Sequence, residues 1–111
     1  MTNHHGARFQ RVDILNRQKT EPSELGERKS SHKVVGTIYA KISPVGSREY
    51  ERAKSFAAEV SHRIVTRYTP LITTTSILCL NNRRFHVNGI LNIDDRNQEL
   101  LIYATEKLGE R

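Results

Sequence analysis

The sequence predicts a mainly β protein, a small antiparallel β-barrel or sandwich of about six strands with one inserted α-helix at about residues 47–59. Two patterns support this fold class. Short apolar segments alternate with polar turns at the spacing of hairpins along most of the chain. Within residues 47–68, hydrophobic residues first recur every three or four positions and then, from Val60 onward, every second position. We therefore expect a short helix that leads into a strand at residues 60–68.

The predicted helix is amphipathic. Its apolar stripe consists of residues three or four positions apart, namely Tyr50, Ala53, Ala57 and Val60. Ser47 follows Gly46 and is expected to be the N-cap, because its hydroxyl can accept a hydrogen bond from a free amide of the first turn. The charged flank contains two pairs three residues apart, which we expect to form ion pairs: Glu49–Arg52 and Glu51–Lys54.

The remaining strands are predicted from alternating segments rich in β-branched and aromatic residues. They cover residues 8–15, 34–42, 75–80, 83–87, 90–93 and 98–105. In the first of them, Val12 and Ile14 share one face. Asn81-Asn82 is expected to form a tight turn, because Asn tolerates positive φ. Asn88-Gly89 is expected to form a bend or bulge, and residues 94–97 a further turn.

We divide the chain into a disordered lead-in (1–7), a single domain (8–106) and a tail (107–111). Residues 16–33 include Pro22 and Gly26, are rich in charge and contain almost no apolar residues, so they predict a long polar loop. A loop of this length is unusual in a small domain and is more often functional than idle. Its candidate interface residues are Glu24, Glu27, Arg28 and Lys29.

The positive charge is unevenly distributed. The formal net charge is +6, and residues 1–70 carry all of it, with 13 Lys/Arg against 7 Asp/Glu (13 − 7 = +6). Such an excess suits a polyanionic partner, and it equally suits simple solubility. The first residues lack the apolar segment of a signal peptide, and no apolar run is long enough to span a bilayer. We therefore expect an intracellular, soluble protein.

Residues with catalytic or metal-binding chemistry are isolated in the sequence. Cys79, the only cysteine, lies in an apolar run and is expected in the core. His62 and His86 have no second ligand at metal-binding spacing, and Asp94-Asp95 is expected to form a turn. The sequence contains no Gly-rich phosphate loop and no nucleophile elbow. We expect no catalysis, no metal and no cofactor.

A series of motifs spread over residues 8–106 indicates a known family. In chain order these are Tyr39-Ala40, Gly46 before the helix, His62 after an Ala-rich segment, Arg67-Tyr68, and a hairpin containing Phe85 and Gly89. Together they resemble the head–tail joining, or head-closure, family of tailed bacteriophages and prophages. The chain departs from that family in having no Trp before the second strand. Its hairpin turn is Asn-Asn-Arg-Arg-Phe instead of a Gly-Arg-x-Tyr type, which affects the loop contacts more than the fold.

The resemblance implies a structural protein without catalysis, located in the virion and assembled in the host cytoplasm. Copies would form a ring, a dodecamer when assembled from chains that are monomeric when free. The implied partners are a portal-adaptor protein above the ring, a tail terminator or tail tube protein below it, and packaged double-stranded DNA in the channel. No membrane and no small-molecule substrate are implied.

For the predicted helix, the candidate subunit or channel contacts are Arg48, Glu49, Arg52 and Lys54. A solvated helix face is an equally simple interpretation of these charges. Arg67 could pair with a carboxylate of its own subunit or contact a neighbour. The main alternative function is a small basic OB-like module that binds single-stranded nucleic acid. That function requires several exposed aromatic side chains on one face, whereas Tyr39, Phe85 and Tyr103 lie in separate strands and are expected mostly in the core.

Overall fold

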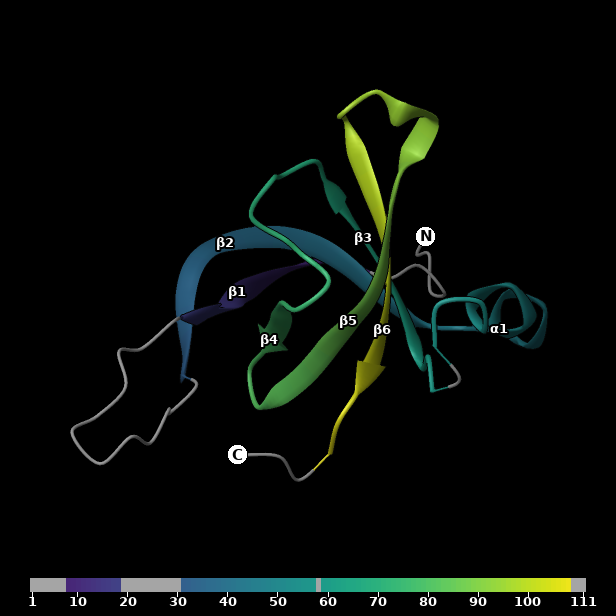
Figure 1. The fold of residues 1–111 in the computed structure, drawn as a ribbon, viewed down its shortest axis with the longest axis horizontal. Coiled ribbons are helices and arrows are strands. Elements are labelled where there is room, and N and C mark those ends of the chain that lie inside the picture. The colour runs from purple at the N-terminus through teal and green to yellow at the C-terminus, as the bar shows by residue number, and fades with distance from the viewer. Residues whose placement is uncertain (1–7, 19–30, 58, 109–111) are drawn as a thin grey trace.

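The computed structural model describes residues 8–18, 31–57 and 59–108. Six antiparallel strands close into a barrel in the order β1-β2-β3-β6-β5-β4 (Figure 1). The elements are β1 (Phe9–Gln18), β2 (Ser31–Pro44), α1 (Ser47–Ala53), β3 (His62–Arg67), β4 (Ile77–Leu80), β5 (Arg83–Asn92), the 3-10 turn η1 (Ile93–Asp95) and β6 (Glu99–Glu106). The predicted fold class is confirmed. No helix in the described residues is both long enough and apolar enough to cross a membrane.

The barrel core follows from the alternation along each strand. Inward-facing side chains from all six strands fill the interior, and the largest fully buried apolar ones are Phe85, Ile14, Ile64, Leu78, Ile102 and Val12. The shared face predicted for Val12 and Ile14 is the inward face of β1, and in β2 the fully buried residue is Ala40. Each Å² of apolar surface removed from water contributes about 25 cal/mol to the free energy of unfolding. This interior is therefore the main source of stability.

The β1–β2 hairpin is longer than predicted. Its register continues through Asn16↔Lys33 and Arg17↔His32 to Gln18↔Ser31, so both ends of the predicted loop 16–33 are strand. Four side chains of these last pairs are exposed: Arg17, Gln18, Ser31 and His32. The hydrophobic pattern did not predict this extension, because the added residues form no apolar face. Backbone hydrogen bonds alone join the two strands there. The four candidate residues Glu24, Glu27, Arg28 and Lys29 lie outside the described residues, as do the predicted lead-in and most of the tail.

Asn16 holds the root of this hairpin to the connection that follows β3. Its Nδ2 donates to the Leu71 carbonyl at 2.8 Å, and its Oδ1 accepts a hydrogen bond from the Ser76 hydroxyl. Ser76 is almost completely buried, and its Oγ also accepts from the Thr73 amide at 2.8 Å. A single polar side chain in β1 therefore bonds to the exposed Leu71 and to the buried Ser76, which lie 55 and 60 positions away in the sequence.

The helix is shorter than the predicted span 47–59. It ends at Ala53, and residues 54–56 form a turn in which the Phe56 amide donates to the Ala53 carbonyl at 2.9 Å. Gly46 is the N-cap and Ser47 is the first helical residue, so the predicted cap was one residue too late. The following strand begins at His62, two residues after the predicted start.

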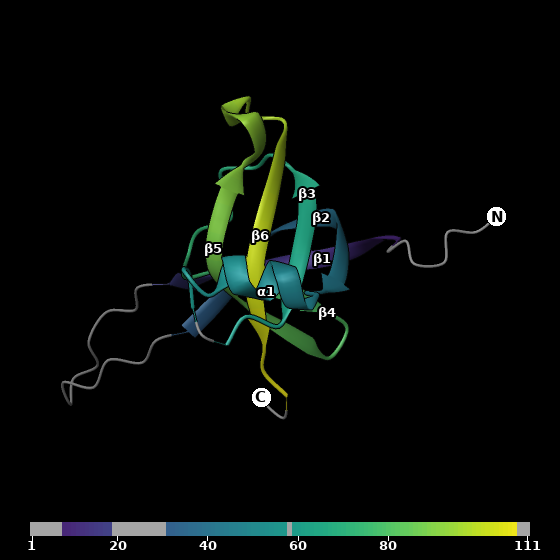
Figure 2. The ribbon, with the colours of Figure 1, turned by 90° about the vertical axis from the view of Figure 1, so that its right-hand side faces the viewer.

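Helix α1 lies across the outside of β5, β6 and β3 (Figure 2). Ala53, Val60 and Tyr103 form a small second core beneath it, with Ala57 and Leu101 packed alongside. This arrangement explains the continuous apolar run in β6, because Leu100 and Ile102 face the barrel interior whereas Tyr103 faces the helix. Buried on both sides, the strand needs no polar face.

A bulge in β5 preserves the inward face of that strand. The register with β6 shifts between Val87 and Gly89, so Val87 and Ile90 both pack toward the interior although they are three residues apart. The bend predicted at Asn88-Gly89 is therefore confirmed within one continuous strand. The Asn turn is also confirmed, since Asn81 has φ of 56°. Asp94 and Asp95, with φ of 55° and 51°, are turn residues as expected.

Candidate assembly and binding surfaces

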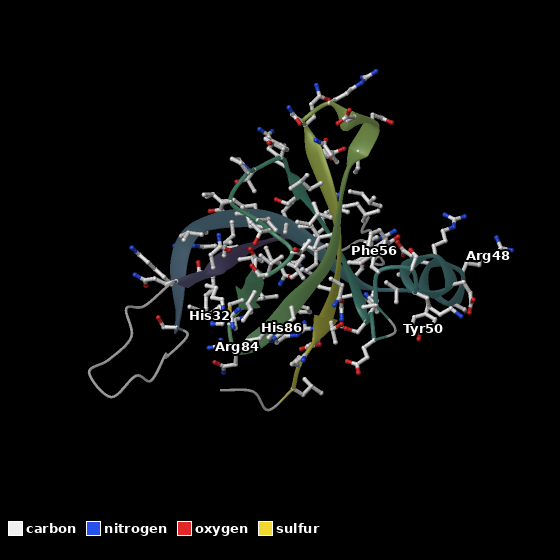
Figure 3. The ribbon with its side chains drawn as sticks, viewed as in Figure 1. His32, Arg48, Tyr50, Phe56, Arg84 and His86 are labelled. Carbon is white, nitrogen blue, oxygen red and sulfur yellow. The ribbon has the colours of Figure 1, made fainter. Side chains whose placement is uncertain are left out.

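The outer flank of α1 carries most of the predicted helix contacts. Arg48, Arg52 and Lys54 are exposed, and Figure 3 shows Arg48 on the side of the helix away from the barrel. The expected Glu51–Lys54 ion pair is present, with Lys54 Nζ 3.1 Å from Glu51 Oε1. The flank is therefore a mixed-charge surface with two unpaired arginines among the described residues.

Glu49 is placed differently from the other helix candidates. It does not pair with Arg52; instead, its carboxylate lies 3.5 Å from Arg63 Nη1 and accepts a hydrogen bond of 3.1 Å from the Tyr103 hydroxyl. Burial, followed by this hydrogen bond to Glu49, raises the pKa of Tyr103. Arg63 Nε is buried without a hydrogen-bond partner among the described residues. The charge of the Arg63 guanidinium is balanced by Glu49, which pairs with its Nη1 atom. Glu49 thus anchors the helix to its own barrel.

Phe56 forms a second anchor, on Gly89. A Cβ atom at Gly89 would lie only 2.1 Å from Phe56 Cδ1, and the Phe56 ring stacks obliquely on Tyr103 with 5.5 Å between centroids. Gly89 is required here for space and not for an unusual φ, because its backbone lies outside the positive-φ region. The family motif position Gly89 therefore has a direct physical role in seating the turn after α1.

A charged cluster closes one end of the barrel. Arg83 donates to both oxygens of Glu106 at 2.8 and 3.0 Å, and His62 Nε2 lies 3.9 Å from Glu106. The His62 ring meets Phe85 edge-on, with centroids 5.1 Å apart. Burial lowers the pKa of His62, with the opposing Glu106 charge a smaller effect. The hydrogen bond from Arg83 lowers the pKa of Glu106.

The same cluster contains a serine, but the contacts of that serine are structural. Ser61 Oγ lies 2.9 Å from His62 Nδ1, which superficially resembles a nucleophile beside a base. The hydroxyl also accepts from the Glu106 amide at 2.8 Å and lies 3.5 Å from the Ala104 carbonyl. Ser61 therefore ties β3 to β6. Among the described residues, no three His, Cys, Asp or Glu side chains gather in a way that could hold a metal ion.

The outside of β1, β2 and β3 forms a second candidate surface that the sequence did not indicate. We name it the basic–aromatic face and define it by six exposed residues: Phe9, Arg11, Tyr39, Lys41, Arg67 and Tyr68. Tyr39 is 64% exposed and Phe9 56%, large fractions for aromatic side chains. The prediction that Tyr39 belongs to the core was wrong, whereas those for Phe85 and Tyr103 are confirmed.

The residues of this face lie close together. Phe9 pairs with Lys41 in the β1–β2 register, and Lys41 Nζ lies 4.7 Å above the Phe9 ring. Arg11 pairs with Tyr39, and Arg67 is the β3 residue next to the pair Ala40↔Thr66. A surface groove joins Phe9, Tyr39, Arg67 and Tyr68 and continues to the start of β6. None of the three cations forms an ion pair within the described residues.

A closed barrel with a docked helix, an extended β1–β2 pair and two charged outer surfaces defines a small assembly or binding domain. The sequence model of the phage head completion protein family matches residues 5–107. The chain belongs to the phage head completion protein family, and it is a structural phage head protein of the virion. The resemblance that the sequence motifs indicated is thereby confirmed.

Solved structures share the fold over nearly the whole chain. The solution structure of protein SF1141 from Shigella flexneri 2a has a TM-score of 0.73 and 25% identity, with 95% of this chain and 97% of that chain covered. A chain in the virion of a native gene transfer agent particle has a TM-score of 0.60 and 13% identity, with 90% and 96% covered, and this likeness shows the fold. Among curated proteins, no significant match to this chain is found.

Proposed function

We propose that this protein forms a ring beneath the portal and its adaptor, closes the DNA-filled head and provides the docking face for the tail. The observation that carries the proposal is that α1 and the last described pairs of β1 and β2, which end at Gln18 and Ser31, lie on opposite sides of the barrel (Figure 1). A ring needs two different complementary faces on each copy. The closed strand order gives each strand a neighbour on both sides, although β2 before Ala40 has no β3 partner, so protruding segments are the natural contacts between copies.

The charge pattern of α1 supports its role as one of these faces. Arg48, Arg52 and Lys54 lie on the same short helix as Glu51, which gives a surface of mixed sign. In a ring, every copy presents this flank at the same place. A flank of one sign only would repel like charges across each boundary, whereas a mixed flank permits complementary pairing.

The domain at residues 8–106 would act as one rigid wedge of the ring. Free chains would be monomers in the host cytoplasm and would become a dodecamer on the adaptor. A tail terminator or tail tube protein would bind below, and packaged double-stranded DNA would occupy the channel. The positive charge of the chain favours such contacts, because phosphate binding needs no sequence recognition.

An add-back experiment tests this function directly. DNA-filled heads are isolated from cells that lack this gene and are mixed with purified protein and with separately purified tails. We expect tails to attach, and infectious particles to form, only when the protein is present. Heads that accept tails equally well without the protein would contradict the connector role. Heads that bind the protein but still release their DNA would contradict the closure role.

A further inference from the structure

We propose that the basic–aromatic face binds single-stranded nucleic acid. The geometry points to this ligand because three exposed aromatic rings and three cations lie together on the outside of adjacent strands. The role goes beyond closing a head, and it is a property of the single chain that does not need the ring.

The first argument is the arrangement of side chains across the sheet. Arg11 lies directly opposite Tyr39, and on the other side of β2 the neighbouring position of β3 is Arg67. Cross-strand neighbours have Cβ atoms about 5 Å apart, so Tyr39 is flanked by a cation on each side. Two residue pairs further along, at Phe9↔Lys41, Phe9 carries the Lys41 ammonium above its ring. Cations and rings therefore alternate over a continuous area.

The second argument is charge complementarity. The acidic residues bordering the face are few: Asp13 accepts a hydrogen bond of 3.0 Å from Thr37, and Glu99 pairs with Arg67 in the β3–β6 register. Neither comes within 4 Å of Arg11, Lys41 or Arg67 as an ion pair in the described part of the chain. Three cations against these two carboxylates leave a local excess of one positive charge (3 − 2 = +1), and no side-chain ion pair holds the cations, which favours a phosphate-bearing ligand.

The third argument selects a single strand over a duplex. A duplex stacks its bases internally and offers only their edges, so exposed aromatic rings gain little from it. An unpaired strand presents base faces, and each base stacked on an aromatic ring contributes appreciably to binding without sequence preference. The groove along Phe9, Tyr39, Arg67 and Tyr68 places such rings beside the cations. In a ring around packaged DNA, this face would hold an unpaired DNA end, a consequence that rests on the proposed function.

The test uses the purified full chain and a fluorescent oligothymidylate of roughly ten nucleotides, with binding followed by anisotropy at several salt concentrations. We expect saturable binding with a slope of log K against log salt near about −2, since three phosphate contacts contribute about −0.7 each. Tyr39→Ala should weaken binding about 5- to 150-fold. Because Tyr39 is largely exposed, this variant should melt like the parent.

A charge-matched pair of variants tests whether binding occurs at the basic–aromatic face or depends only on the overall positive charge of the chain. The variant Arg11→Gln, Lys41→Gln, Arg67→Gln and the control Arg48→Gln, Arg52→Gln, Lys54→Gln each remove three positive charges. We expect the first to abolish the salt dependence and the control to bind like the parent.

Three outcomes would overturn the proposal: equal losses in the two triple variants, equal affinity for a blunt duplex, or tighter binding of a poly-glutamate peptide. The last result would assign the face to an acidic protein partner. Failure of this binding leaves the add-back experiment unaffected, so the two proposals can fail separately.

Discussion

At the residue scale, the packing of α1 against the barrel depends on Gly89 having no Cβ atom. Gly89 leaves space for the Phe56 ring, which would otherwise overlap a Cβ atom by more than an ångström. The ring in turn contacts Tyr103, whose hydroxyl bonds to Glu49 of the helix. A single missing methyl group therefore permits the whole contact between the helix, the turn that follows it and the barrel.

Gly89→Ala should lower the free energy of unfolding by about 1–3 kcal/mol, the usual cost of overpacking a well-filled site. Chemical denaturation measures it. Gly46→Ala is a suitable control, because open space surrounds that position and only the N-cap preference changes, at about 0.5 kcal/mol. Combining Gly89→Ala with Phe56→Ala should recover part of the loss. A purely additive double variant would show that the Phe56 contact is not the cause.

From the pKa shifts in the His62–Arg83–Glu106 cluster, we predict that the free energy of unfolding decreases as the pH falls. Burial lowers the pKa of His62 below its ordinary value of 6.5, so the unfolded chain takes up that proton first and stability is lost as the pH falls below about 6.5. The pKa of Glu106 is also lowered, mainly by Arg83, so its contribution is present above about 4.5 and is lost as the pH falls through the folded-state pKa.

Thermal unfolding as a function of pH should therefore show a melting temperature that decreases in two stages between pH 7 and pH 3. His62→Gln should remove the upper stage and leave the lower one. Arg83→Gln should reduce the lower stage instead, because it removes the hydrogen bonds that lower the pKa of Glu106. An unchanged slope between pH 7 and pH 5.5 in His62→Gln would mean that another group is responsible.

At the element scale, α1 has one side committed to its own barrel and one side free. Glu49 faces Arg63 and Tyr103, whereas Arg48, Arg52 and Lys54 remain in solvent. The helix has only seven residues, too few to be stable alone, so its contacts with the barrel must hold it. The candidate helix residues therefore divide into an anchor and an outward surface.

Glu49→Ala should release the helix locally while the barrel stays folded, because Arg63 and Tyr103 lose a shared partner. Hydrogen exchange should accelerate in residues 47–57, and the total stability should fall by about 1–3 kcal/mol. Glu51→Ala removes only the exposed pair with Lys54 and should cost about 0–1 kcal/mol. Equal exchange rates in the two variants would argue against the anchoring role of Glu49.

Reversing the outward charges tests the other side of the helix. Arg52→Glu combined with Lys54→Glu should leave the monomer folded, since exposed ion pairs contribute only about 0.2–1 kcal/mol. Tail attachment to filled heads should nevertheless decrease in the add-back experiment. The exchange Arg52→Lys with Lys54→Arg keeps both charges and serves as the control. Normal yields of infectious particles from the reversed variant would show that this flank is merely solvated.

At the scale of the whole molecule, closure of the sheet determines how copies can meet. Each strand has a neighbour on both sides over part of its length, so edge-to-edge pairing between copies is limited to segments such as β2 before Ala40, which has no β3 partner. We expect the purified chain to be a monomer by light scattering at micromolar concentration. A stable ring formed by the chain alone would contradict this expectation and would mean that the adaptor is not needed to start assembly.

The local structure could be derived from the sequence because its causes are local. The change of period near Val60, the inward pair Val12 and Ile14, and the turns at Asn81 and Asn88-Gly89 all depend on neighbouring residues and on backbone preferences. The order of motifs along the chain also sufficed to indicate the family.

Three features were decided only by the tertiary structure. Glu49 has its partner 54 positions away in Tyr103 and not three away in Arg52. Tyr39 faces solvent because barrel closure determines which side of β2 is inside, and both sides of that strand contain apolar residues. The polar ends of the β1–β2 hairpin pair through the backbone, which leaves no hydrophobic pattern to detect. In each case the deciding energy comes from contacts between distant segments, which a linear pattern does not contain.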